Sequence, residues 1–303
     1  MKFETFKDKL CDIIAMEMGE GYEVCAREVT KNNGVVLTGI MAKKHDSNIS
    51  PTLYINEHYN KDVKEEDLTE MGRAFAEHLR QAIVPDIDVI EDLLEYDRIR
   101  DHIAIKLVNT RKNKDMLDNV PSREFLNLSI CYYFGMDKAF EQSDQMTQRA
   151  TVLIGNALME KWGIDEESLY EAAISNMKKA HPDKVISMQD MLKSRIDSLT
   201  AGISMYILTN DINLFGASAI LYGDGIKDLA DRLDSDIIIL PSSVHEVILL
   251  PSNEPKKDAD DLLNIVCEVN KNEVRDEDIL ADSVYLYDRA SKSISLLCQK
   301  GEN

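Results

Sequence analysis

The chain has 303 residues, of which 44% are hydrophobic, and its 55 acidic and 35 basic residues give a formal net charge of −20 at pH 7. The apolar share excludes wholesale disorder, and the negative charge disfavours partners with phosphate backbones, so we expect no nucleic-acid partner and no anionic membrane surface. The length predicts one large domain or about two domains of ordinary size.

The cysteines and the first residues predict a cytoplasmic protein. The five cysteines are odd in number and no pair has the CxxC spacing, which favours free thiols in a reducing compartment and speaks against zinc. Charged residues interrupt the apolar residues of the first segment, so the hydrophobic core of a signal peptide is missing. No uncharged apolar run reaches about 18 residues, so we expect no membrane-spanning helix.

The N-terminal part predicts helices around a small group of strands. Phe3, Phe6, Leu10 and Ile13 recur at helical spacing and share one face. The turn sequence at residues 32–34 predicts a hairpin, because an Asn-Gly pair suits the turn that joins two antiparallel strands. The expected strands here are residues 22–29, 35–42, 52–59 and 103–109, and the expected helices are residues 3–18, 65–83 and 87–100.

The C-terminal part predicts short strands alternating with helices. The clearest strand signal is residues 126–134, where apolar and polar residues alternate strictly. The other expected strands are residues 151–155, 205–209, 219–222, 237–240, 247–250, 284–287 and 294–298. The expected helices are residues 165–180, 187–199, 224–233 and 258–269.

These elements predict a mixed α/β (α+β) fold with predominantly antiparallel or mixed sheets flanked by helices. Short connections such as the one after Pro241 cannot join parallel neighbours. The polar run at residues 110–115 predicts a boundary between an N-terminal α+β region, residues 1–110, and a C-terminal α/β region, residues 111–303. Residues 151–161 and 219–230 resemble each other, which indicates either an internal duplication or two uses of common strand-to-helix chemistry.

The most concentrated polar cluster lies between two expected strands at Ser242, Ser243, His245 and Glu246. A histidine acts as a base near neutral pH, and a serine becomes a nucleophile when such a base lies beside it. The cluster is therefore a candidate catalytic site, although Glu246 and its neighbour would point to opposite faces of a strand. The alternative is structural, with the hydroxyls in turn hydrogen bonds and the other two side chains partly buried.

Two further features are candidate sites, and two others speak against a cofactor or a metal. Asn210 follows an expected strand, where an asparagine serves as a site residue or as a structural cap. The helical spacing of Asp88, Glu91, Asp92 and Glu95 could bind a hard cation or could form a solvated helix face. Gly223 and Gly225 lack the third glycine of a dinucleotide fingerprint, and His58 has no second histidine nearby, so we expect no cofactor and no metal.

Several short motifs occur along nearly the whole chain: residues 53–56, 106–109, 120–121, 162–164, 169–170 with Ala173 and Asn176, 208–210 with Gly216 and Ala217, 241–246, 268–270 and 284–285. Together these motifs resemble those of an uncharacterised family of gut Clostridia and their relatives, known only as a domain of unknown function. The resemblance implies no activity. A more distant resemblance is to another uncharacterised bacterial family, in which His245 is not matched.

The sequence favours a cytoplasmic, non-enzymatic binding or regulatory protein, and the partner that we expect is another protein. The alternative is a hydrolase or transferase that works from the turn at residues 242–246. A third hypothesis is a decoy that mimics nucleic acid through its negative charge, which would require carboxylates gathered on one face. A pocket at His245 would favour the enzyme, and an exposed apolar patch would favour the binding protein.

Overall fold

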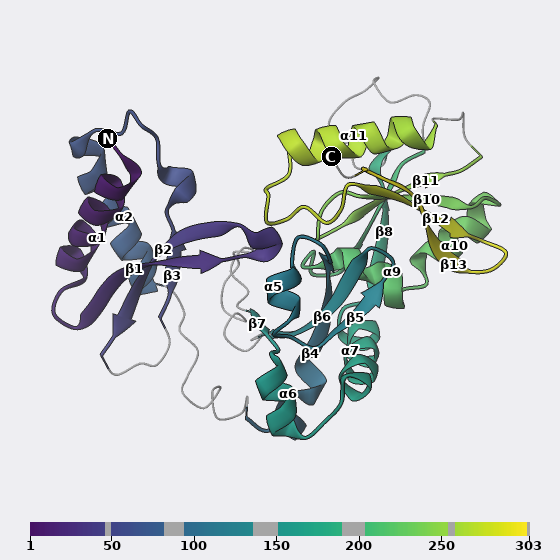
Figure 1. The fold of residues 1–303 in the computed structure, drawn as a ribbon, viewed down its shortest axis with the longest axis horizontal. Helices are drawn as coiled ribbons and strands as arrows, with labels where there is room; N and C mark the ends of the chain where they lie inside the picture. Colours follow the sequence, from purple (N-terminus) through teal and green to yellow (C-terminus); the bar gives the residue numbers. More distant parts are fainter. Residues whose placement is uncertain (46–49, 82–93, 136–150, 190–203, 254–257, 302–303) are drawn as a thin grey trace. The chain divides into compact units, whose positions relative to one another are not determined.

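The computed structural model describes residues 1–45, 50–81, 94–135, 151–189, 204–253 and 258–301. The chain forms two compact units (Figure 1), the first built from Met1–Leu94 with Met136–Ala150 and the second from Glu95–Gly135 with Thr151–Asn303. The first boundary lies at Leu94, whereas the polar run predicts it near residue 110. The reason is that β4 (Ile103–Asn109) pairs along its whole length with β6 (Leu128–Gly135) and so belongs to the second unit.

In the first unit, two helices pack on one face of a three-stranded antiparallel sheet. The sheet order is β1-β2-β3, and Phe6, Leu10 and Ile14 of α1 are fully buried in a core that includes Ile40 of β2. Gly72 allows the close approach of the helices, because a Cβ there would lie 2.4 Å from the Ile13 side chain. The elements are α1 (Phe3–Met18), β1 (Tyr22–Thr30), β2 (Val36–Lys44), β3 (Thr52–Tyr54) and α2 (Glu65–Gln81).

The hairpin predicted around Asn33 is confirmed, but the third strand is shorter than expected. Asn33 and Gly34 both have positive φ, at 61° and 70°, which is the backbone that this turn requires. The third strand ends at Tyr54, and Asn56–His58 forms a short 3₁₀ turn instead. The Asn56 side chain accepts a hydrogen bond from the Thr38 N–H (2.7 Å), so beyond Tyr54 a side chain takes the place of a backbone carbonyl beside β2.

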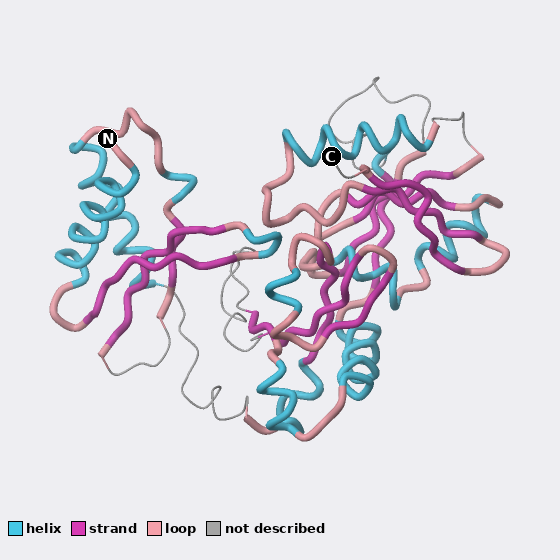
Figure 2. The backbone as a smooth tube through the Cα atoms, viewed as in Figure 1, coloured by secondary structure: helices cyan, strands magenta, loops and turns pink. Residues whose placement is uncertain are grey.

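The second unit contains two antiparallel sheets that share one core (Figures 1 and 2). One sheet centres on β6, which pairs with β4 on one side and with β5 (Ser122–Phe125) and β7 (Thr151–Leu153) on the other. The larger sheet has six strands in the order β13-β12-β10-β11-β9-β8. These strands are β8 (Asp183–Ser187), β9 (Tyr206–Asn210), β10 (Ile237–Pro241), β11 (Val247–Pro251), β12 (Ser283–Asp288) and β13 (Ser293–Gln299).

Helices cover both faces of the larger sheet. On one face, α11 (Ala259–Asn272) buries Leu262 and Val266 against β10 and β12. On the other face, α10 (Gly225–Leu233) packs against β8 and β11, whereas α7 (Glu166–Ala180) packs against β4 and β6 of the smaller sheet, within the shared core. The shorter helices are α4 (Tyr96–Ile99), α5 (Lys114–Leu117), α6 (Asn156–Trp162) and α9 (Ala219–Tyr222).

The predicted fold class is confirmed, since all the strand pairs of the described residues are antiparallel and helices flank the sheets. The strand predicted at residues 219–222 is wrong, because these residues form α9 and bury Ala219 and Tyr222 at helical spacing. The stretch that resembles it, residues 151–155, begins with strand β7, so the two do not share a local structure. Most of the helices predicted at residues 87–100 and 187–199, with Asp88, Glu91 and Asp92, lie outside the described residues.

Candidate functional site

The turn at residues 242–246 joins β10 to β11 and is tied to two other segments. The Ser243 N–H donates to the Glu246 carbonyl (3.1 Å) across the turn. The buried Val244 donates its N–H to the Asp278 carbonyl (2.8 Å) and accepts from the Ala217 N–H (3.3 Å). The backbone of the turn is therefore fixed from both sides.

The His245 imidazole uses both of its nitrogens within the protein. Its Nδ1 accepts a hydrogen bond from the Phe215 N–H (3.1 Å), so this nitrogen carries the lone pair and the proton belongs to Nε2. Nε2 lies 3.4 Å from Asp278 Oδ1, and the ring stacks on the Phe215 ring with centroids 5.5 Å apart and planes at 14°. A third of the side chain is exposed (33%), so solvent reaches the ring, although each ring nitrogen already has a partner within the protein.

The serines of the turn do not form a nucleophile–base pair with this ring. The Ser243 hydroxyl accepts from the His245 backbone N–H (3.0 Å), which is a local turn contact. Among the described residues, no hydroxyl hydrogen bonds to the imidazole. Ser242 and Glu246 lie at the two ends of the turn, so the structure brings the four predicted residues together without the geometry of general-base catalysis.

Asn210 reaches the same region from the end of β9. Its side chain is fully buried, donates through Nδ2 to the Leu214 carbonyl (2.8 Å) and accepts through Oδ1 from the Leu214 N–H (3.1 Å). These two hydrogen bonds fix the segment between Asn210 and Leu214, so that the next residue, Phe215, lies against His245. The neighbouring Thr209 hydroxyl donates to the His245 carbonyl (2.9 Å), so the strand end and the turn form one cluster.

Gly216 is needed for this close approach. A Cβ at this position would lie 2.2 Å from the Thr209 hydroxyl and 2.6 Å from the His245 carbonyl oxygen. No side chain fits there without moving the strand end or the turn.

Gly223 and Gly225, at the start of α10, contact a carboxylate of the chain itself. The Asp183 carboxylate accepts from the Gly225 N–H (2.7 Å), and a Cβ on Gly223 or Gly225 would lie 2.3 or 2.4 Å from Asp183 atoms. Backbone N–H groups at a helix start attract anions. Here the Asp183 carboxylate of the chain itself takes that place.

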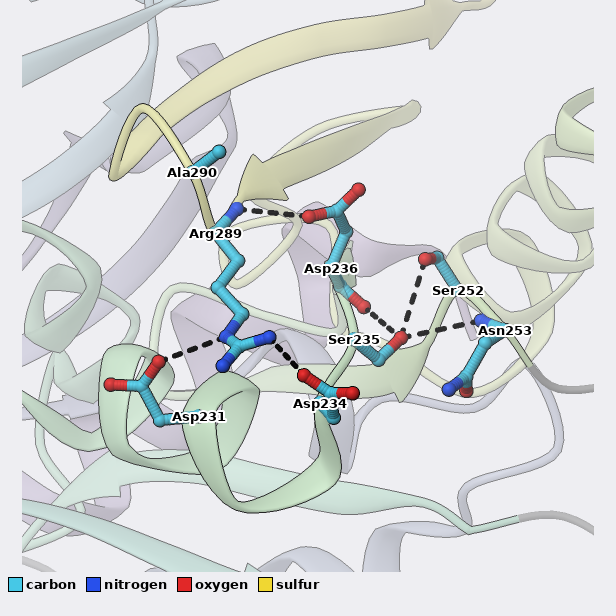
Figure 3. A pocket seen from close by; sticks show the side chains of 8 residues that line it. All are labelled: Asp231, Asp234, Ser235, Asp236, Ser252, Asn253, Arg289 and Ala290. Carbon is cyan, nitrogen blue, oxygen red and sulfur yellow. Dashed lines mark hydrogen bonds and ion pairs between the residues drawn. The ribbon is translucent and has the colours of Figure 1, made fainter.

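A second candidate site is a pocket of about 570 Å³ at one end of the larger sheet (Figure 3). Three separate segments contribute to it: the end of α10 with its connection to β10, the residues after β11, and the turn between β12 and β13. The lining residues are Asp231, Asp234, Ser235, Asp236, Ser252, Asn253, Arg289 and Ala290.

Arg289 organises the charged side of this pocket (Figure 3). Its guanidinium donates to Asp231 (2.9 Å) and to Asp234, and its backbone N–H donates to the Asp236 carboxylate (2.9 Å). Hydrogen bonding to Arg289 lowers the pKa of Asp231. Three carboxylates and one guanidinium line the pocket, so the lining is negative overall.

Ser235 holds the uncharged side together. This buried residue donates its hydroxyl to the Asp236 carbonyl (2.8 Å) and accepts from the Asn253 N–H (3.3 Å), and its hydroxyl lies 3.4 Å from that of Ser252. Asp234, just before it, ends α10 in the left-handed conformation (φ 49°). The pocket is thus built on fixed backbone rather than on loose side chains.

The described residues contain no cluster of three or more His, Cys, Asp or Glu side chains that could hold a metal ion. None of their helices is long and apolar enough to cross a membrane. All five cysteines are free thiols.

A family model matches residues 3–289. The chain belongs to DUF5688, a family of unknown function. Neither the curated proteins nor the solved structures contain a match. The family match covers the turn at residues 242–246 and every lining residue of the second pocket except Ala290, and it attaches no activity to either site.

The sequence pattern missed most of the residues that complete the two sites in this DUF5688 chain. Asp278 and Phe215 contact the His245 ring, but neither lies in a polar cluster that the sequence distinguishes. Arg289 lies more than 50 residues from the two aspartates that it pairs with. The sequence did single out His245, through the polar cluster between two strands, and Asn210, through its place at a strand end, and the structure places both in the same region.

Proposed function

We propose that this protein is a cytoplasmic, non-enzymatic binding protein that recognises cationic side chains of a partner protein at the Arg289 pocket. The observation that supports this most is the pocket itself, a preformed hollow with a negative lining on rigid backbone. Its volume of about 570 Å³ falls in the range of about 300–1,000 Å³ of ligand sites.

The charges of the pocket suit a cationic group. The side chains of Asp231 and Asp234 are 54% and 87% exposed, and exposed ion pairs are worth little. A lysine or arginine of a partner can therefore replace the Arg289 guanidinium at Asp234 with small loss. The net charge of −20 also draws basic partners toward the chain.

The proposal of a cytoplasmic location draws support from the cysteines. Five thiols without a disulfide suit a reducing compartment, in which protein disulfides are rare.

The geometry gives the hydrolase or transferase hypothesis less support. A general base needs a free nitrogen within hydrogen-bonding reach of the nucleophile. Phe215 and Asp278 face the two nitrogens of His245, and the Ser243 hydroxyl contacts backbone rather than the ring.

Fluorescence anisotropy with a labelled lysine-rich peptide tests the binding proposal. The test variant is Asp231→Asn/Asp234→Asn, which removes two carboxylates from the pocket and keeps their shapes. The matched control is Glu4→Gln/Asp8→Asn, which removes two exposed carboxylates from α1 in the first unit and changes the net charge equally. We expect the pocket variant to weaken binding about tenfold, or about 1.4 kcal/mol, and the control to keep the parent affinity.

Equal weakening in both variants would show non-specific attraction and would contradict the proposed site, as would failure of the parent to bind. A second measurement covers the enzyme hypothesis. Sustained turnover of simple esters or amides by the parent, lost in His245→Asn, would replace the binding proposal.

A further inference from the structure

The connection from β9 to Gly216 is held in place by side chains around one imidazole. Asn210 binds Leu214 through both of its amide atoms, and Phe215 follows in the left-handed conformation (φ 50°). A non-glycine residue in this conformation is held there by its surroundings. Its N–H donates to Nδ1 of His245 (3.1 Å), and the two rings stack.

This hydrogen bond exists only while Nδ1 is unprotonated. A protonated imidazole carries a hydrogen on each nitrogen and accepts from neither. The new Nδ1–H would point at the Phe215 N–H, so the two donors would repel each other. The contact between Nε2 and Asp278 (3.4 Å) would be kept and strengthened.

We propose that His245 is a proton-sensitive latch on residues 211–216, closed while the imidazole is neutral and released when it gains a proton. Histidine is the side chain whose charge ordinarily changes between about pH 5 and 8. With a third of its side chain exposed, His245 can exchange protons with solvent without unfolding of the unit. This inference goes beyond the proposed binding function and does not depend on the Arg289 pocket.

Charged groups on several segments act on this imidazole. Asp278 faces Nε2 from the segment before β12, with Oδ1 3.4 Å from this nitrogen. Lys106 on β4 lies over the same Phe215 ring, with Nζ 5.1 Å from the centroid. Glu246, the next residue in the turn, carries a carboxylate.

Protonation would change only the contacts of the His245 ring and the conformation of residues 211–216. The His245 backbone keeps its bonds to Thr209 and Ser243 in either protonation state, because neither involves the ring. Phe215 packs edge-on against Tyr133 of β6 (5.0 Å, 71°), so loosening of residues 211–216 uncovers part of a buried tyrosine.

NMR of the full chain with ¹⁵N-labelled phenylalanine and histidine tests the latch. We expect a coupling between the Phe215 amide nitrogen and His245 Nδ1 at pH 8 that disappears by pH 5. Over the same range, the amide protection factor of Phe215, corrected for the intrinsic pH dependence of exchange, should fall about tenfold or more, as expected for a local opening.

His245→Asn is the matched variant, because an asparagine oxygen can accept from Phe215 and does not titrate. It should keep Phe215 protected at both pH values. His181→Asn removes another partly buried histidine, which faces Asp211 (3.3 Å), and should leave the transition at Phe215 unchanged. Absence of the coupling at pH 8, constant protection from pH 8 to 5, or a transition that survives in His245→Asn would overturn the latch.

Discussion

Replacement of His245 by alanine should destabilise the second unit. The change removes the acceptor of the Phe215 N–H and the ring that stacks on Phe215. An amide left without its acceptor costs about 1–3 kcal/mol when buried, and aromatic stacking adds about 0.5–1.5 kcal/mol. Because a third of the side chain is exposed, water offsets part of both losses, so we expect about 1–3 kcal/mol in total.

Thermal unfolding by calorimetry measures this loss. For a folding unit of about 150–250 residues, each kcal/mol lowers the melting temperature by about 2–4 °C, so His245→Ala should lower it by at least about 2 °C. Ser243→Ala should cost less, about 0.5–1 kcal/mol, because water can replace the hydroxyl that accepts from the His245 N–H. A His245→Ala protein that melts within about one degree of the parent would refute the structural role of the ring.

The remaining predictions concern packing, ionisation and thiols. Gly216→Ala should lower the free energy of unfolding, measured by urea titration, by about 3 kcal/mol or more, because the new Cβ would overlap Thr209. The control is Gly163→Ala, at a left-handed position (φ 67°) in open space, which should lower it by about 1–2 kcal/mol. Similar losses in the two variants would contradict the packing argument. Burial raises the pKa of three tyrosines in the folded protein. Their contribution to the free energy of unfolding is therefore complete below the pKa of an unfolded tyrosine, near pH 10, and is lost as the pH rises from there through the raised pKa. These tyrosines are Tyr132, Tyr222 and Tyr285. Absorbance at 295 nm should show that their phenols ionise only when the protein unfolds at alkaline pH. Ionisation of these phenols near pH 10 in the folded protein would contradict the prediction. Burial also raises the pKa of Cys131 to about 11, so this thiol should react slowly with Ellman's reagent in the folded protein, while the denatured, unreduced chain should release five thiols; three or fewer would reveal a disulfide.

Local periodicity was sufficient for the long elements. The stripe of Phe6 and Leu10 predicted α1, and the Asn-Gly turn predicted the first hairpin, because each pattern needs only the interactions of neighbouring residues. Local periodicity did not distinguish a strand from a helix at residues 219–222. A run of four apolar residues fits a strand as well as a helical turn, and the packing that follows Gly216 decided in favour of α9.

The alternation at residues 126–134 predicted a strand correctly but said little of its surroundings. Leu126 lies in the turn before β6 with φ 58°, and the strand begins at Leu128. The polar-looking positions Ser129 and Cys131 are as buried as their neighbours, because the strand is covered on both faces. An alternating pattern normally indicates one wet face, and only the second layer of packing shows that this strand has none.

The sequence by itself determined the net negative charge, the mixed α/β class and the grouping of polar residues at the turn after Pro241. Only the tertiary structure decided what those residues contact. The acceptor role of His245 depends on Phe215 and Asp278, and the second pocket depends on Arg289 meeting Asp231 and Asp234. These partners are about 30 to 60 residues apart, and hydrogen bonds over such separations are fixed by strand order and helix packing. A local pattern of residues carries no information about either.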